Sequence, residues 1–255
     1  LLPLILMLEL KDTLLARDEL PVARAVQQAL LPREHPRLRG WELWSYSVPA
    51  NDVGGDLVDY IELGPERLGV ALGDVSGKGL GAALLSAKLQ ATLRALGPET
   101  PSLDELGERM NTILVNDGIE NRFATMFYAE LGPDSGHIRF LNAGHNPPYL
   151  FRTSGEIQEL HASSRPLGML PDSCYAEGVA DMDTDEFLLV YSDGVTEATD
   201  SGGEEFGEDR VRALLPELGR LAPELAGKRL LEEIDLHLGG EHPQDDLSLV
   251  LIRKR

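Results

Sequence analysis

The helical segments of this sequence come in pairs, and the strand-like segments come in runs. Helices are predicted over 78–96 and 102–117, and again over 207–218 and 222–237. Strands are predicted over 41–48, 57–63, 67–74, 122–131, 137–143, 147–152, 156–160, 186–193 and 247–253. A doubly wound α/β fold needs a helix between every two strands, whereas short turns such as Gly64-Pro65 join antiparallel neighbours. The pattern therefore predicts an α+β fold, with two packed antiparallel sheets and helices outside them.

The 255 residues are enough for one large domain. We predict this domain over 35–255, preceded by a helical lead-in over 1–31. Within the lead-in, helices are expected over 4–18 and 19–31, where Pro21 suits a first turn. The apolar opening LLPLILML is far too short to span a membrane and lacks the features of a signal peptide. The lead-in is therefore interpreted as the remnant of a linker or as an oligomer contact.

The net charge of the chain limits which classes of binding partner are expected. Forty-three acidic residues against 23 lysines and arginines give a net charge of −20. This excess argues against nucleic acid or an anionic membrane as the main partner. Cys174 is the single cysteine, so no internal disulfide can form, which fits a reducing compartment. We expect a cytoplasmic protein.

Aspartates recur at the ends of segments that are expected to be buried strands, each beside a glycine or another acid. They are Asp52, Asp56, Asp74, Asp193, Asp245 and Asp246. One such aspartate is an ordinary turn former. Several carboxylates brought together repel each other unless a cation neutralises them, and oxygen-only ligands favour Mg²⁺ or Mn²⁺ over zinc. Two such ions would activate a water molecule and hold a phosphoryl group.

The stretch GVALGDVSGKGLGAALLSAKL at 69–89 predicts strand, glycine turn and helix, which invites other interpretations. Gly77, Gly79 and Ala82 fit a dinucleotide-binding pattern, but the helix leads to a second helix rather than to a parallel strand. A P-loop would need one more residue between its glycines, and Ser or Thr where Gly79 stands. A serine-hydrolase elbow is one residue out of register at Ser76. These alternatives are disfavoured.

Three further residues have structural explanations. His145 in NAGHNPP is interpreted as a turn histidine hydrogen-bonded to the backbone. Lys78 in SGKG is interpreted as a solvated turn lysine, although it could steer a phosphate. Cys174 has no histidine context that matches a catalytic pair and is interpreted as inert.

Eight motifs follow one another along the chain: NDVGGD, GDVSGKGLGAALL, RFATMFYAEL, LNAGHNPPYL, RPLGML, LLVYSDGVTEA, FGEDR and DDLSLVLIR. In content and order they resemble the bacterial PPM-type (protein phosphatase 2C-like) serine/threonine phosphatases, in the branch of stage II sporulation protein E and the sigma-factor regulators. The resemblance runs from about residue 24 to 253 and includes AVQQALLPRE. It implies a four-layer α-β-β-α sandwich with a site for two Mn²⁺ or Mg²⁺ ions at one end.

The resemblance also implies the metal ligands: Asp56, Asp74, the carbonyl of Val75, Asp193 and Asp245. Asp74 is expected to bridge both ions, and Asp74 and Asp193 are the expected catalytic residues. Asp245 is favoured over Asp246, because relatives outside this branch carry Asn at the second position. The acid that protonates the leaving group stays unassigned.

The implied reaction is attack of a metal-bound hydroxide on phosphoserine or phosphothreonine. The implied substrate is a phosphorylated anti-sigma-factor antagonist, and the implied regulator is an upstream sensor domain. Residues 1–31 would then belong to a helical linker that pairs with a second copy of the chain. A catalytically inactive regulatory domain with the same fold is the alternative.

Overall fold

The computed structural model describes residues 20–32, 34–64, 66–117, 122–133, 135–162 and 164–255. Its strands are β1 (Trp41–Val48), β2 (Leu57–Gly64), β3 (Arg67–Val75), β4 (Ala124–Leu131), β5 (His137–Ala143), β6 (Tyr149–Phe151), β7 (Ile157–Glu159), β8 (Gly178–Asp181), β9 (Phe187–Tyr191) and β10 (Leu247–Lys254). A first helix spans 20–30. The other helices are α2 (Leu80–Leu96), α3 (Leu103–Asp117), α4 (Asp193–Thr196), α5 (Gly207–Leu218) and α6 (Pro223–Leu238). The helix expected over 4–18 lies outside the described residues.

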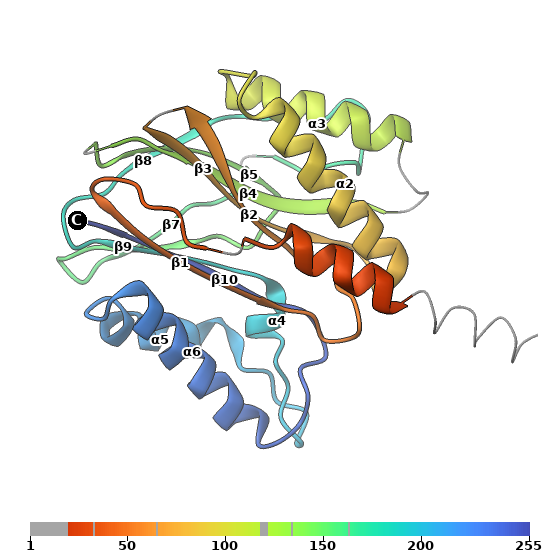
Figure 1. Cartoon of the computed structure of the whole chain (residues 1–255). Coiled ribbons are helices and arrows are strands. Elements are labelled where there is room, and N and C mark those ends of the chain that lie inside the picture. Colours follow the sequence, from red (N-terminus) through yellow and green to blue (C-terminus); the bar gives the residue numbers. More distant parts are fainter. Residues whose placement is uncertain (1–19, 33, 65, 118–121, 134, 163) are drawn as a thin grey trace, which may run out of the picture.

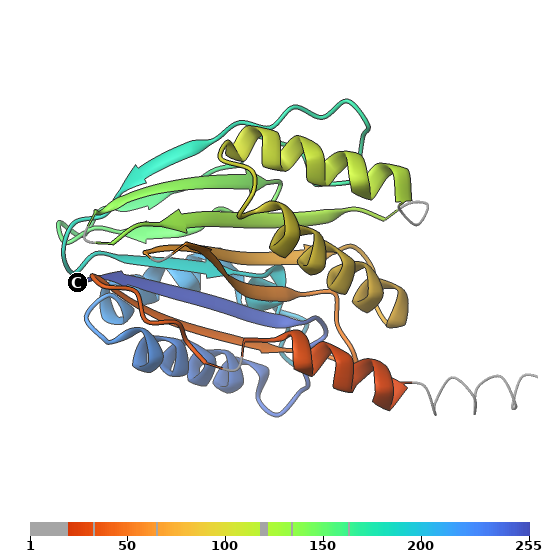
Figure 2. The ribbon, with the colours of Figure 1, turned by 45° about the horizontal axis from the view of Figure 1, so that its top comes forward.

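The strands form two five-stranded sheets. One has the order β1-β10-β9-β6-β7 and the other β2-β3-β4-β5-β8. We call them the β10 sheet and the β3 sheet. Every pairing within them is antiparallel, including the predicted β2–β3 hairpin. Helices α2 and α3 cover the β3 sheet, and α5 and α6 cover the β10 sheet (Figures 1 and 2). The predicted α+β class and four-layer sandwich are confirmed.

Strand alternation explains the layers. Along β10, Val250 and Ile252 face the apolar cluster between the two sheets, whereas Leu249 and Leu251 face the cluster beneath α5 and α6. Successive side chains of a strand point to opposite faces, so a strand that is apolar at every position is buried on both sides. A third cluster fills the space between the β3 sheet and the helices α2 and α3.

Two short elements differ from the sequence prediction. The predicted strand 186–193 ends at Tyr191, and Asp193 instead begins the short helix α4, where the Glu197 N–H donates to the Asp193 carbonyl at 2.8 Å. The strand β8 was not predicted. Both elements have four residues, which is too few to show a helical or alternating period.

The 20–30 helix lies against α2 and the loop before β2. The Leu30 carbonyl accepts hydrogen bonds from Gln90 Nε2 at 2.9 Å and from Arg94 Nη2 at 3.1 Å, both on α2. Gln27 exchanges two hydrogen bonds with the backbone of Gly54. Within the described ranges, every helix is too short or too polar to cross a lipid bilayer.

Candidate metal centre

Four loops meet at one end of the sandwich. The loop 51–56 precedes β2 and the turn 76–79 follows β3, and these strands are neighbours in the β3 sheet. Helix α4 follows β9 and the loop 244–246 precedes β10, which are neighbours in the β10 sheet. Strand β10 also contacts β2 and β3 across the sandwich. The antiparallel pairing therefore brings the ends of four strands together.

Five aspartates whose charges influence one another lie at this end of the sandwich: Asp56, Asp74, Asp193, Asp245 and Asp246. We call this set the acidic cluster. All five were selected from the sequence. The sixth selected aspartate, Asp52, is exposed on the loop 51–56.

Asp246 organises the loop 51–56. Its Oδ1 accepts the N–H of Ala50 at 2.9 Å, and its Oδ2 accepts the N–H groups of Gly55 at 2.6 Å and of Asp56 at 3.2 Å. A Cβ atom on Gly54 would lie 2.1 Å from Asp246 Oδ2, so only glycine lets the loop pass this close. The Asp246 carboxylate is therefore already occupied by backbone donors.

Asp56 lies deep in the cluster with only 6% of its surface exposed. Its Oδ2 is buried and has no hydrogen-bond partner. Burial raises the pKa of this carboxyl well above its ordinary value, and the charges of Asp74 and Asp246 raise it further. A buried carboxylate oxygen without a donor is costly, and a bound cation would remove that cost.

Asp74 lies near the end of β3, opposite Thr125 of β4. Burial raises the pKa of Asp74 to about 7, and the charges of Asp193 and Asp245 contribute to the rise. The next residue, Val75, has its carbonyl beside the loop 51–56. A Cβ atom on Gly55 would lie 2.7 Å from that carbonyl oxygen. A side chain at position 55 would therefore crowd the Val75 carbonyl.

Asp193 and Asp245 form the half of the cluster on the β10 sheet. Burial raises the pKa of Asp193, and the charge of Asp245 raises it further. The Asp245 side chain is 32% exposed and its Oδ2 lies 2.9 Å from Lys78 Nζ. Its Oδ1 accepts the N–H of Asp246 at 2.9 Å. Unlike Asp246, Asp245 thus faces another side chain rather than the loop 51–56.

The donor set suits a hard divalent cation. It consists of carboxylate and carbonyl oxygens, it includes an unpartnered buried oxygen, and its carboxylates repel one another. Among the described residues, no three Asp, Glu, His or Cys side chains converge on one point. Asp245, directed towards Lys78, is one ligand candidate that would have to turn to join the others.

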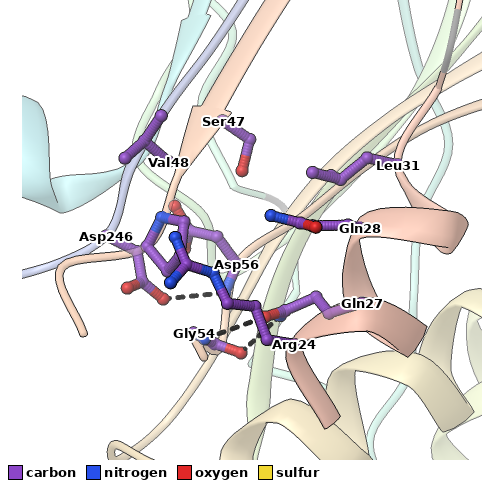
Figure 3. A pocket seen from close by; sticks show the side chains of 10 residues that line it. Arg24, Gln27, Gln28, Leu31, Ser47, Val48, Gly54, Asp56 and Asp246 are labelled. Carbon is purple, nitrogen blue, oxygen red and sulfur yellow. Dashed lines mark hydrogen bonds between the residues drawn. The ribbon is translucent and has the colours of Figure 1, made fainter. Parts of the chain in front are cut away.

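A pocket of about 160 Å³ lies between the cluster and the 20–30 helix (Figure 3). Asp56 and Asp246 line it from one side, and Arg24 and Gln28 line it from the helix. Gln27 Nε2 donates to the Gly54 carbonyl at 2.7 Å, and its Oε1 accepts the Gly54 N–H at 3.0 Å. The lead-in helix therefore holds the loop that carries Asp56.

The family model described as stage II sporulation protein E matches residues 64–255, which is more than half of the chain. The chain belongs to this family. The match confirms the resemblance to PPM-type serine phosphatases that the motifs indicated, and it covers three of the four cluster-forming loops. The loop 51–56 lies before the matched residues.

Individual relatives agree with membership of the stage II sporulation protein E family. "Protein IcfG" of Synechocystis is 29% identical over 271 residues, which cover 96% of this chain and 42% of that protein. "Phosphoserine phosphatase RsbU" of Bacillus subtilis is 27% identical over 243 residues, which cover 94% of this chain and 71% of that protein. The SiaA-PP2C domain of Pseudomonas aeruginosa shares the fold with a TM-score of 0.77 at 20% identity, with 93% and 96% covered. The chain thus spans less than half of the first relative.

Two residues near the cluster escaped the sequence analysis. Arg122 Nη1 donates to the Ser76 carbonyl at 2.9 Å, beside the glycine turn. Glu197, just after α4, has its pKa raised by burial and then by the charges of Asp193 and Asp245. The spacing between Asp193 and Glu197, one turn of helix, was the available signal for the second residue. For Arg122 the sequence offers none, since the contact spans 46 positions.

Two residues have more contacts than the sequence interpretation gave them. His145 is buried; its backbone N–H donates to Asn142 Oδ1 at 2.8 Å, its Nδ1 lies 2.9 Å from Thr125 Oγ1, and the backbone of Tyr191 is a further partner. Burial lowers its pKa to about 4. Lys78 is not simply solvated, since it pairs with Asp245. Cys174 is exposed.

Proposed function

We propose that this chain is a Mn²⁺- or Mg²⁺-dependent phosphatase that hydrolyses phosphoserine or phosphothreonine in a protein. The observation that carries the proposal is the acidic cluster, in which oxygen donors from both sheets meet at one end of the sandwich. The donor type favours Mg²⁺ or Mn²⁺. The name of RsbU, a phosphoserine phosphatase, supports the reaction class.

The proposed metal ligands are Asp56, Asp74, the Val75 carbonyl, Asp193 and Asp245. The buried, unpartnered Oδ2 supports Asp56, and the position of the Val75 carbonyl beside Gly55 of the loop 51–56 supports Val75. We leave Asp246 out of the set, because its carboxylate accepts three backbone N–H groups that fix the loop 51–56 in place. Asp245 accepts one backbone N–H, and its other oxygen faces the side chain of Lys78. The hydrogen-bond partners of Asp245 and Asp246 thus give these two adjacent aspartates different proposed roles.

Two bound divalent ions would supply a nucleophilic water at neutral pH and neutralise the phosphoryl oxygens. Asp74 is influenced by the charge of Asp56 and by the charges of the aspartates on the β10 sheet, so its carboxylate would hold the ions together with ligands from either half of the cluster. Asp193 is the first residue of α4 and belongs, with Asp245, to the half of the cluster on the β10 sheet. We assign catalysis to Asp74 and Asp193.

The proposed substrate is a phosphorylated anti-sigma-factor antagonist in the cytoplasm, a proposal that follows from the branch of the family that the motifs resemble. The proposed regulator is a sensor domain that acts through the lead-in of residues 1–31, ahead of the phosphatase domain at 35–255. The two hydrogen bonds between Gln27 and Gly54 support such a route, since they connect the lead-in helix to the loop of Asp56.

We further propose that the lead-in pairs with a second copy of the chain. Val22 and Val26 of the 20–30 helix are 65% and 53% exposed, and Leu84 of α2 is 59% exposed. They line an apolar groove of about 380 Å³ between the two helices. Contiguous apolar surface of this kind is typical of interaction sites. A mass measurement showing a monomer at all concentrations would contradict this part of the proposal.

The decisive experiment measures phosphate release from an aryl phosphate and from a phosphoserine protein, with Mn²⁺, with Mg²⁺ and with EDTA. We expect activity that needs the divalent ion and that EDTA abolishes. No activity with any divalent ion would contradict the proposal. It would favour the alternative, an inactive regulatory domain that binds a signalling partner.

A further inference from the structure

Lys78 connects the two halves of the acidic cluster. It lies in the turn 76–79, where Gly77 and Gly79 adopt positive φ angles of 92° and 78° that favour glycine. The Lys78 ammonium lies 2.9 Å from Asp245 Oδ2 and donates to the Gln244 carbonyl at 2.6 Å. A residue that follows the β3 sheet thereby holds the loop that precedes β10.

The ion pair engages the remaining oxygen of Asp245. Its Oδ1 already accepts the N–H of Asp246, and its Oδ2 faces Lys78. Lys78 therefore partly neutralises the half of the cluster on the β10 sheet.

We infer that Lys78 is a built-in counter-cation that competes with a divalent ion for Asp245. The inference rests on the proposed function, because it takes Asp245 as a metal ligand. An ion that binds Asp245 Oδ2 must share this oxygen with the ammonium or displace it, and the ammonium repels a second cation nearby. Both effects have the same sign, so Lys78 lowers the affinity of the site for metal.

The matched variants are Lys78→Met and Lys228→Met. Lys228 forms an ion pair of 2.7 Å with Glu224 on α6, and its side chain is 58% exposed against 55% for Lys78. Both variants change the net charge equally, but only one acts at the cluster. Lys78→Arg keeps the charge. Mn²⁺ affinity is measured by calorimetric titration of the whole chain.

We expect Lys78→Met to bind its weaker Mn²⁺ ion roughly twofold to fivefold more tightly than the unsubstituted chain, the range expected for removing a partly exposed charge contact. Lys228→Met and Lys78→Arg should bind like the unsubstituted chain. Unchanged or weaker binding by Lys78→Met would overturn the inference while leaving the proposed function intact. Absence of Mn²⁺ binding in every protein would overturn both.

A second measurement needs no metal. Unfolding in EDTA of Lys78→Met, Asp245→Asn and the double variant reports the interaction energy of the pair directly. We expect a favourable interaction that weakens as NaCl is raised, because a partly exposed ion pair is screened. An interaction energy of zero at low salt would show that the pair does not form, and would overturn the inference.

Discussion

The two sheets contribute unlike halves to the acidic cluster. On the β3 sheet, Asp56 and Asp74 are largely buried, burial is the main cause of their raised pKa values, and one oxygen of Asp56 has no partner. On the β10 sheet, Asp245 is partly exposed and paired with Lys78. The repulsion between Asp56 and Asp74 is relieved only by an added cation. The charge of Asp245, in contrast, is offset by solvent exposure and by the ion pair with Lys78. The first half should therefore dominate both metal binding and catalysis.

Asp74→Asn tests this difference most strongly. Removing a carboxylate that would help to hold both ions should cost several kcal/mol of transition-state stabilisation, about a thousandfold in kcat/KM for the aryl phosphate. Asp193→Asn, in the other half, should lose less, about 10- to 100-fold. Full activity of Asp74→Asn would contradict the assigned mechanism. Full activity of Asp193→Asn would reject only that ligand.

The pH dependence of stability tests the buried half without metal. Asp74 has a pKa of about 7 in the folded protein and about 3.9 when unfolded. Between these values the folded state keeps a proton that the unfolded state has lost, so stability falls as the pH rises. The contribution is up to about 4 kcal/mol.

Urea unfolding in EDTA near pH 4.5 and pH 7.5 measures this contribution for the unsubstituted chain and for Asp74→Asn. The variant should lose less stability over this interval, and Mn²⁺ should restore stability to the unsubstituted chain at the higher pH. Identical pH slopes for the two proteins would show that Asp74 is not the group responsible.

The adjacent residues Asp245 and Asp246 should differ in their contribution to the free energy of unfolding. Asp246→Ala would leave the buried N–H groups of Gly55 and Asp56 without acceptors, and should reduce the free energy of unfolding by about 3 kcal/mol. Asp245→Ala removes a partly exposed ion pair and should change it by less than about 1 kcal/mol. Urea denaturation in EDTA compares the two. Equal losses of unfolding free energy in the two variants would refute the distinction between Asp246, which fixes the loop 51–56, and Asp245, the proposed metal ligand.

The smallest expected effect concerns the lead-in helix. Gln27→Ala removes two hydrogen bonds to Gly54 and should reduce stability by about 1 kcal/mol and weaken Mn²⁺ binding, because the loop of Asp56 loses its support. Gln28→Ala is the matched control, since Gln28 lines the same pocket from an exposed position (Figure 3). Indistinguishable variants would exclude this role of Gln27.

Much of the fold could be predicted because its main strands and helices are long enough to show their periods. β1, β10 and α5 lie within one residue of the predicted bounds. α4 and β8 escaped prediction, since four residues carry no period and tertiary contacts define them. The cluster was predictable as a set of residues, because aspartates at the ends of apolar strands are visible in the chain. The contacts of Lys78 with Asp245 and with the Gln244 carbonyl could not be predicted, since the contact with Gln244 spans 166 positions.

The sequence by itself determined the class of fold, the family and the aspartates that gather at one end, because strand periodicity and motif order are properties of neighbouring residues. Only the tertiary structure decided what each aspartate does. Asp246 fixes the loop 51–56 because it accepts the N–H groups of Gly55 and Asp56. These donors lie 191 and 190 positions away in the sequence, so no local pattern could predict the contact. Asp245 became the partner of a lysine from the other sheet. Hydrogen bonds and burial between distant segments set these roles, and no local pattern encodes them.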